Sequence, residues 1–172
     1  MNVITRAYYH VLRRINPIKY AIKVGVNIEK NSGSKLISTN FGSEPWLITI
    51  GKHVEITEGV RFITHDGATW VLRNQSKYDR VRKFGKIIIG DNCFIGMNSI
   101  ILPGVTIGRN SIIGAGSIVN KNVPVDSVYA GNPAHFICSL TEYAEKCLSN
   151  TPDYDEERYK ADRKSEILRM LS

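Results

Sequence analysis

Residues 89–108 read Ile89-Gly-Asp-Asn-Cys-Phe-Ile-Gly-Met-Asn-Ser-Ile-Ile-Leu-Pro-Gly-Val-Thr-Ile-Gly108, and this stretch decides the fold because an aliphatic residue recurs in it every six positions. The same interval continues beyond the stretch. A period of six fits neither the 3.6-residue turn of a helix nor the two-residue alternation of a long strand. It predicts short strands separated by turns. The aliphatic anchors are Ile89, Ile95, Ile101, Ile107, Ile113, Val119 and Val125.

A second column of residues follows the same period, four positions after the anchors. Three six-residue units complete one coil of about 18 residues, and stacked coils pair their strands in parallel about 4.8 Å apart. We therefore predict an all-β fold, a parallel β-helix with a dry interior lined by both columns. The second column consists of Cys93, Ser99, Val105, Ser111, Ser117 and Val123.

An earlier block shows the same period in a different frame. Its anchors are Ile50, Ile56 and Phe62, and Val54 and Val60 occupy its second column. Residues 66–86 lie between the two blocks and are predicted to form an excursion from the coils. Further upstream, Val24-Gly25, Ile37 and the segment 41–46 are interpreted as imperfect first coils.

Both ends of the chain are predicted to be helical. The apolar residues within 4–15 fall on one helical face, and a second helical region follows residue 138. Helices there would cover the open ends of the β-helix, whose exposed strands would otherwise pair with other chains. The first face consists of Ile4, Ala7, Tyr8, Val11, Leu12 and Ile15. The predicted organisation is a helical cap at 1–20, a β-helix domain at 21–137 with its excursion at about 66–86, and a helical tail at 138–172.

Length and composition restrict the classes of function. The 172 residues, 42% of them hydrophobic, suffice for one domain. The net charge of +7 favours an anionic partner, such as nucleic acid, a phospholipid surface or a phosphorylated ligand. Three widely spaced cysteines predict neither disulfides nor a zinc cage, and Cys93 is expected to be a packing residue rather than a nucleophile. No stretch reaches the roughly 20 apolar residues of a membrane span, so we expect a cytoplasmic protein.

The stretch 89–108 resembles the signature of hexapeptide-repeat O-acetyltransferases, which include galactoside and maltose O-acetyltransferases. Ile113-Gly-Ala-Gly-Ser-Ile-Val-Asn-Lys-Asn-Val-Pro124 and Tyr129-Ala-Gly-Asn-Pro-Ala134 resemble the closing motifs of that family. Ile56-Thr-Glu-Gly-Val-Arg-Phe-Ile-Thr-His-Asp-Gly67 is most similar to the branch that modifies capsules and exopolysaccharides, where a histidine before the excursion is catalytic. The resemblance covers roughly residues 50–137.

The resemblance implies a left-handed β-helix that forms a homotrimer, with active sites between subunits. It implies acetyl-CoA as acyl donor, no catalytic metal and no nucleic-acid partner. It also implies a sugar hydroxyl as acceptor, in the synthesis of capsule, exopolysaccharide or lipopolysaccharide. At the two positions after the last motif where the family often has basic residues, this chain has His135 and Cys138. The coenzyme contacts implied by resemblance are Met97 and Ala115 at the pantetheine, Asn120 and Lys121 towards the nucleotide, and His135.

Acetyl transfer from a thioester to an alcohol requires a base for the hydroxyl proton, a role that a neutral imidazole suits. His65 ends the first block at the edge of the excursion, where the resemblance also locates the catalytic histidine. Asp66 is predicted to orient the ring, bind the acceptor or cap the turn, and Trp70 to contact the acceptor. His10 in the cap helix and His53 in a repeat turn are expected to be plain surface residues.

The excursion is basic, with Asp79 as its one acidic residue beyond position 72. It is interpreted either as a solvated loop or as a surface that binds coenzyme phosphates or an acidic glycan. Trp70 and Tyr78 favour the glycan, because sugar rings often stack on aromatic side chains. The basic residues are Arg73, Lys77, Arg80, Arg82, Lys83 and Lys86.

Other functions remain open from the sequence. Within acyltransferases, the acceptor could be serine or an antibiotic such as chloramphenicol or a streptogramin. A γ-type carbonic anhydrase shares the fold but needs three histidines clustered in the coils, which this sequence lacks. A non-catalytic β-helix scaffold would use the basic, amphipathic first helix for a weak contact with a membrane surface.

Overall fold

The computed structural model describes residues 3–172, which form two compact units divided after Leu140. Met1 and Asn2 of the predicted cap, and the side chain of Ile4, lie outside the described part. Within that part, no helix is long and apolar enough to cross a membrane.

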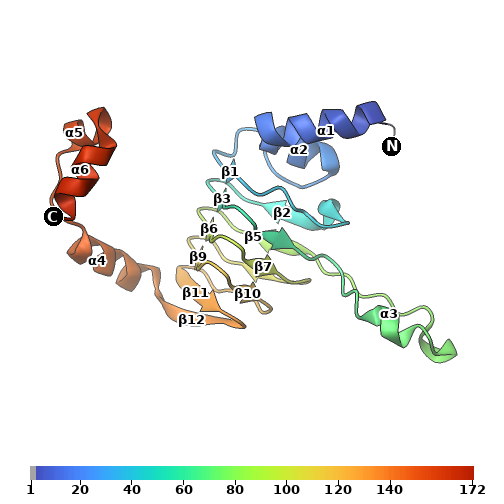
Figure 1. Cartoon of the computed structure of the whole chain (residues 1–172). Helices are drawn as coiled ribbons and strands as arrows, with labels where there is room; N and C mark the ends of the chain where they lie inside the picture. Colours follow the sequence, from blue (N-terminus) through green and yellow to red (C-terminus); the bar gives the residue numbers. More distant parts are fainter. Residues whose placement is uncertain (1–2) are drawn as a thin grey trace. The chain divides into compact units, whose positions relative to one another are not determined.

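The first unit is a stack of coils whose short strands form three sheets, A, B and C (Figure 1). The predicted parallel pairing is confirmed, for example by Ile95 opposite Ile113. Sheet A consists of β2 (Ile48–Ile50), β5 (Ile87–Ile89) and β8 (Thr106–Ile107). Sheet B consists of β1 (Lys35–Leu36), β3 (Glu55–Ile56), β6 (Phe94–Ile95), β9 (Ile112–Ile113), β11 (Ser127–Gly131) and β12 (Ala134–Ser139). Sheet C consists of β4 (Arg61–Phe62), β7 (Ile100–Ile101) and β10 (Ile118–Val119).

Strand β10 pairs in parallel with β7 and completes sheet C. The chain visits sheets A, B and C in turn, so each coil has three corners. We call them the A–B corner (residues 51–53, 90–92, 108–110 and 124–126), the B–C corner (57–59, 96–98 and 114–116) and the C–A corner (63–65, 102–104 and 120–122). The C–A corner of the second coil carries the excursion.

Both predicted columns line the interior, with one exception. The anchors from Ile50 to Val119 and the whole second column, including Cys93, are buried. The prediction for Val125 is wrong, because its side chain is 50% exposed. Val123 instead pairs with Ile107, two residues earlier than the period requires. The last coil is therefore shorter, and Val125 falls at the corner.

The first coil also differs from its prediction. Val24 ends a helix and Gly25 is its left-handed cap (φ 106°), so these residues are not part of a coil. Ile37 is exposed, while Leu36 and Phe41 are buried. The coil spans the region between the bridges Asn27↔Thr49 and Asn40↔Arg61.

Two helices, α1 (Val3–Ile15) and α2 (Pro17–Val24), cover the N-terminal end of the coils. A series of aromatic contacts joins them to the interior, from Tyr9 to Tyr20, then Phe41 and Phe62. On the predicted apolar face of α1, Leu12 is buried. Tyr8, Val11 and Ile15 are exposed, so that face is only partly used for packing.

The remaining elements of this unit are short. A 3-10 turn, η1 (Pro45–Leu47), precedes β2, and the excursion holds α3 (Thr69–Leu72) and η2 (Ser76–Tyr78). Strand β12 pairs antiparallel with β11, which ends the parallel stack on sheet B. The helix that follows, α4 (Leu140–Asn150), leads out of the unit.

A ladder of polar side chains runs along the A–B corner. Nδ1 of His53 lies 2.7 Å from Oδ1 of Asn92, whose amide donates to Asn110 at 2.9 Å. The Asn110 amide donates to Asp126 at 2.7 Å. All four residues have φ between 53° and 56°, the left-handed conformation that asparagine tolerates better than most residues. His53 is thus exposed, as predicted, but it begins this ladder.

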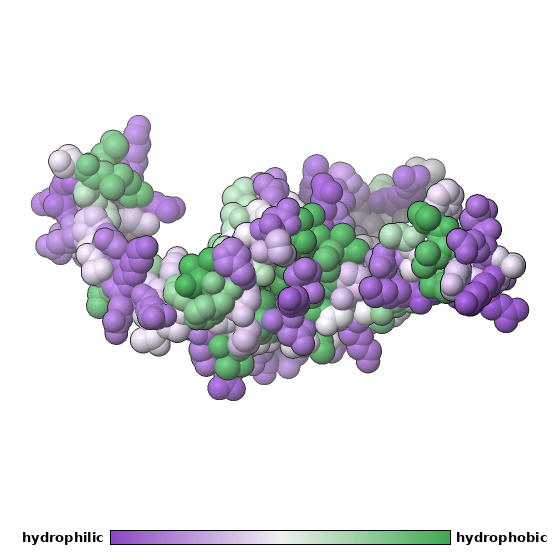
Figure 2. Space-filling model, turned by 90° about the horizontal axis from the view of Figure 1, so that it is seen from below, coloured by the Kyte–Doolittle hydropathy of each residue, from purple (hydrophilic) through white to green (hydrophobic). Residues whose placement is uncertain are grey.

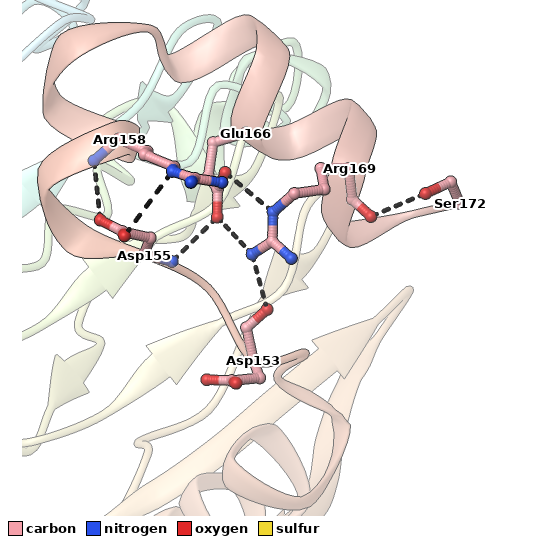
Figure 3. A network of polar contacts seen from close by, with 6 residues as sticks. All are labelled: Asp153, Asp155, Arg158, Glu166, Arg169 and Ser172. Atoms are coloured by element: carbon pink, nitrogen blue, oxygen red, sulfur yellow. Dashed lines mark hydrogen bonds and ion pairs between the residues drawn. The ribbon is translucent and has the colours of Figure 1, made fainter.

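The second unit, Thr141–Ser172, contains the rest of α4 with α5 (Glu156–Ala161) and α6 (Arg163–Met170). Its buried carboxylate is Glu166, which accepts bonds from Nε of Arg169 at 3.0 Å and from the backbone N–H of Asp155 at 2.8 Å (Figure 3). These bonds lower the pKa of Glu166 to about 2, with Arg169 the largest cause.

Candidate functional site

His65 and Glu44 form a hydrogen-bonded pair at the C–A corner. Oε2 of Glu44 lies 2.9 Å from Nδ1 of His65, and the Thr64 hydroxyl donates to the same oxygen. The His65 side chain is 41% exposed and that of Glu44 only 17%. The pair therefore has a sheltered acid and an accessible ring.

The ionisation of Glu44 fixes which ring nitrogen can act as a base. The bond from Thr64, followed by that from His65, holds the pKa of Glu44 below its ordinary value, so the carboxylate is charged at neutral pH. A charged carboxylate only accepts hydrogen bonds, so Nδ1 of His65 carries the proton. Nε2 of the neutral ring then has the free lone pair that a general base requires.

The excursion places one wall beside His65. Its returning strand forms an antiparallel bridge from Phe84 to His65, and the two rings lie 6.0 Å apart. Gly85 then packs against the next coil, where an added Cβ would lie 2.3 Å from the backbone nitrogen of Gly104. Only glycine permits this approach, which fixes the exit of the excursion.

A pocket of about 200 Å³ lies between the pair and the excursion. Asp66 lines it, but its carboxylate accepts from the backbone N–H of Ala68 at 3.0 Å and pairs with Lys83 at 3.4 Å. Asp66 was predicted to orient the ring, bind the acceptor or cap the turn, and in the structure its carboxylate caps the turn. The residue that contacts the His65 ring is Glu44. The pocket is lined by Glu44, His65, Asp66, Gly67, Thr69, Arg73, Arg82, Lys83 and Phe84.

A larger cavity of about 1010 Å³ lies on the other side of the Glu44 segment. Ser43 and Pro45 line this cavity, whereas Glu44 between them lines the His65 pocket. Trp46 borders the cavity with 65% of its surface exposed. Trp70 is 74% exposed on the excursion and does not line either cavity.

The predicted coenzyme contacts lie at two different corners of the chain. Met97 and Ala115 are neighbours at the B–C corner, where the N–H of Gly116 bonds to the carbonyl of Met97 at 2.7 Å. Asn120 and Lys121 lie at the C–A corner, in a later coil than His65. His135 is exposed on β12, where its ring lies 3.3 Å from the carbonyl of Pro133. One chain therefore does not bring these residues together around His65.

Burial removes Cys93 from consideration as a nucleophile. The side chain is 3% exposed, and burial raises the pKa of its thiol, which disfavours the reactive thiolate. Across residues 3–172, no three His, Cys, Asp or Glu side chains are grouped to hold a metal ion.

Sequence reasoning missed Glu44. The residue stands in Ser43-Glu44-Pro45-Trp46, which was interpreted only as part of an imperfect coil. No regular period leads to it, because the first coil pairs with the second at an offset of 20 residues at Lys35 and 21 at Asn40. Asn40 pairs with Arg61, and the same offset of 21 residues joins Glu44 to His65.

Comparisons with known proteins agree with the repeat. A family model described as the hexapeptide repeat of succinyl-transferase matches residues 86–121. Protein CapG of Staphylococcus aureus is 56% identical over 116 residues, which make up 67% of this chain and 66% of that protein. A probable macrolide acetyltransferase of Lysinibacillus sphaericus is 38% identical over 105 residues, 52% of this chain and 58% of the relative. The chain thus spans less than two thirds of the length of these relatives.

Solved structures include similar chains as well. A hexapeptide-repeat acetyltransferase from Vibrio cholerae shares 39% identity over 54% of this chain and 51% of its own, with a TM-score of 0.49. A maltose O-acetyltransferase from Clostridium difficile 630 shares 38% identity over 54% of this chain and 48% of its own, with a TM-score of 0.46. The family model itself falls on the coils from β5 to β10, where the six-residue period is strictest.

Proposed function

Because the chain belongs to the hexapeptide-repeat acetyltransferase family, we propose that it transfers an acetyl group from acetyl-CoA to a hydroxyl of a saccharide. One observation carries the proposal. The carboxylate of Glu44 holds Nδ1 of His65, while the ring borders an open pocket. This is the arrangement of a general base with an orienting acid.

In the proposed reaction, Nε2 of His65 takes the proton of the acceptor hydroxyl while the oxygen attacks the thioester carbonyl. The ring becomes an imidazolium, which the charge of Glu44 stabilises at 2.9 Å. When the carbon–sulfur bond breaks, His65 returns its proton to the departing sulfur. The products are the acetyl ester and the coenzyme thiol, and no acetyl-enzyme forms.

We assign the active site to the contact between subunits of a left-handed, homotrimeric β-helix. Two observations support this assembly. The pantetheine contacts inferred from the resemblance, Met97 and Ala115, lie at the B–C corner, whereas His65 lies at the C–A corner, so a second copy would supply them to the site. The excursion also carries exposed apolar side chains at Trp70, Val71 and Leu72, and Figure 2 shows hydrophobic surface on the excursion. Such surface is typical of a contact with another chain.

A saccharide acceptor is supported by the cavity beside Glu44. The exposed indole of Trp46 borders it, and aromatic faces are suited to stacking on sugar rings. Asn40 and Glu58 line the same cavity and supply an amide and a carboxylate for sugar hydroxyls. Free serine as acceptor would leave most of this space unfilled.

The reaction is assigned to the cytoplasm, where acetyl-CoA is made. A weak contact with an anionic membrane surface is part of the same proposal. Residues 1–28 contain five Lys or Arg and no Asp or Glu, and α1 leaves Val11 and Ile15 exposed. Basic helices with an exposed apolar face bind such surfaces.

The proposal is tested with purified protein, radiolabelled acetyl-CoA and a panel of free, nucleotide-linked and lipid-linked sugars. We expect label in a saccharide with wild type and with the control His10→Ala, whose histidine is exposed on α1, but not with His65→Ala. Transfer to serine or to chloramphenicol, with none to any sugar, would overturn the choice of acceptor. Equal transfer by His65→Ala would overturn the mechanism.

A further inference from the structure

The pocket that contains His65 receives three cationic side chains from the excursion, Arg73, Arg82 and Lys83. Two of them already have partners. Lys83 pairs with Asp66 at 3.4 Å, and the guanidinium of Arg82 donates to two backbone carbonyls of its own turn. Arg73 differs, because its Nε is buried and has no hydrogen-bond acceptor among the residues that the structure describes.

The charges in the pocket do not balance around Arg73. The pocket has two carboxylates, and both already have partners. Asp66 pairs with Lys83, and Glu44 accepts hydrogen bonds from Thr64 and His65. No carboxylate within the described chain lies within 4.0 Å of the Arg73 guanidinium. A buried donor without an acceptor destabilises the folded chain, and more so when the donor is charged. An anion in the pocket would remove this cost.

A guanidinium is a specific receptor for one kind of anion. Its planar donors match the two oxygens of a carboxylate or phosphate, and it stays charged at every physiological pH. The pocket volume of about 200 Å³ is smaller than the roughly 300–1,000 Å³ that drug-sized ligands occupy. It therefore suits one sugar unit that bears an anionic group.

The phosphates of the coenzyme do not fit this position. In the proposed reaction the thioester carbonyl must lie next to His65, and the whole pantetheine arm separates that carbonyl from the diphosphate. Arg73 lines the same small pocket as His65, so its anion must lie close to the reacting atoms. The acceptor is the substrate whose remaining groups lie there.

We propose that Arg73 binds a carboxylate or phosphate of the acceptor, so that the enzyme selects an acidic saccharide. The inference rests on the proposed function, since it takes His65 as the base. It assigns the excursion a definite task in selecting the substrate. It also separates Arg73 from the other basic residues of the excursion, which have partners or lie away from the pocket.

The test is calorimetric titration of the full chain with glucuronate, glucose 1-phosphate and neutral glucose. We expect wild type to bind at least one anionic sugar about tenfold to a hundredfold more tightly than glucose, the range of a charge-assisted hydrogen bond. Arg73→Gln should bind all three equally, and Arg73→Lys should lie between. Preference for glucuronate identifies a carboxylate, and preference for glucose 1-phosphate identifies a phosphate.

Arg80→Gln is the matched control, because Arg80 is exposed and does not line the pocket. It should retain the wild-type preference. The inference is overturned if Arg73→Gln, shown to be folded by circular dichroism, keeps that preference, or if Arg80→Gln loses it equally. His65→Ala should still bind the anionic sugar. Binding that depends on Arg73 without acetyl transfer to any sugar would support the subsite and overturn the proposed function.

Discussion

Oε2 of Glu44 lies 2.9 Å from Nδ1 of His65, although 21 residues separate the two in sequence. The distance follows from the stacking of coils, since Asn40 pairs with Arg61 at the same offset. The acid and the proposed base are therefore separated by the same number of residues as the bridged pair Asn40 and Arg61 of successive coils.

Replacing Thr64 tests how the acid is tuned. The Thr64 hydroxyl is the largest cause of the lowered pKa of Glu44, so Thr64→Val should raise that pKa towards its ordinary value. The carboxylate would then be protonated at a higher pH, which NMR titration of the Glu44 side-chain carboxyl carbon measures directly. Thr57→Val, at another coil corner, should leave the pKa of Glu44 in place. An unchanged Glu44 pKa in Thr64→Val would contradict the role of the Thr64 hydroxyl in holding that carboxylate charged.

Glu44→Gln should lower turnover by about 10–10³-fold, because the amide cannot stabilise an imidazolium by charge. Its oxygen can still accept from Nδ1, so the ring should remain oriented. Acetyl-CoA affinity, measured by calorimetry, should stay at the wild-type value. A rise in KM for acetyl-CoA with unchanged turnover would assign Glu44 to binding instead.

His65→Ala should reduce turnover by about 10²–10⁴-fold and still bind acetyl-CoA, the effect expected for loss of a general base. The side chain is 41% exposed, so the interior should retain its packing. Wild type should show sequential kinetics, and mass spectrometry should find no acetylated enzyme. Ping-pong kinetics with a burst would require a covalent route.

Mixing two inactive variants tests the shared site. His65→Ala removes the base at one corner, and Ala115→Trp blocks the proposed pantetheine contact at another. Co-refolded mixtures should regain activity, because some interfaces would combine the intact His65 of one copy with the intact Ala115 of the next. Light scattering should give about 58 kDa, three times the 19.3 kDa chain. Mixtures that stay inactive, or an active monomer, would place the whole site in one chain.

Acid should destabilise the C-terminal helices through Glu166. Its pKa is about 2 when folded, below the value of 4.5 for an unperturbed glutamate, so its contribution is fully present above pH 4.5. The contribution should be lost as pH falls from about 4.5 to 2. Glu166→Gln should remove this dependence and lower helicity at neutral pH, as measured by circular dichroism. Glu157→Gln, at an exposed position of α5, is the control and should change neither the acid dependence nor the helicity at neutral pH.

The last coil offers a matched pair for stability. Val123→Ala should lower the free energy of unfolding by about 1–3 kcal/mol, because it opens a cavity in the buried column. Val125→Ala should stay within about 0.5 kcal/mol of wild type, as usual for an exposed position. Denaturant unfolding measures both. Equal losses would contradict the shortened coil.

The parallel coils could be predicted because the interior is filled by two residues in every six, a constraint that shows directly in the sequence. The prediction that Val125 is buried was wrong because the six-residue period continues in the sequence, whereas the last coil is two residues shorter in the structure. Glu44 was missed because the first coil has no regular anchors. Its offset to the next coil is 20 residues at Lys35 and 21 at Asn40, so no fixed period connects it with His65.

The side-chain ladder from His53 through Asn92 and Asn110 to Asp126 gives the coils a direction and an order. Each amide donates toward the C-terminal end and accepts from the other side, and the final carboxylate can only accept. Isoleucines in the interior are interchangeable between layers, so they cannot distinguish a correct stack from one displaced by a layer. A displaced stack would break the donor-to-acceptor sequence at this corner. The ladder therefore favours the correct pairing of layers at this corner over a displaced one.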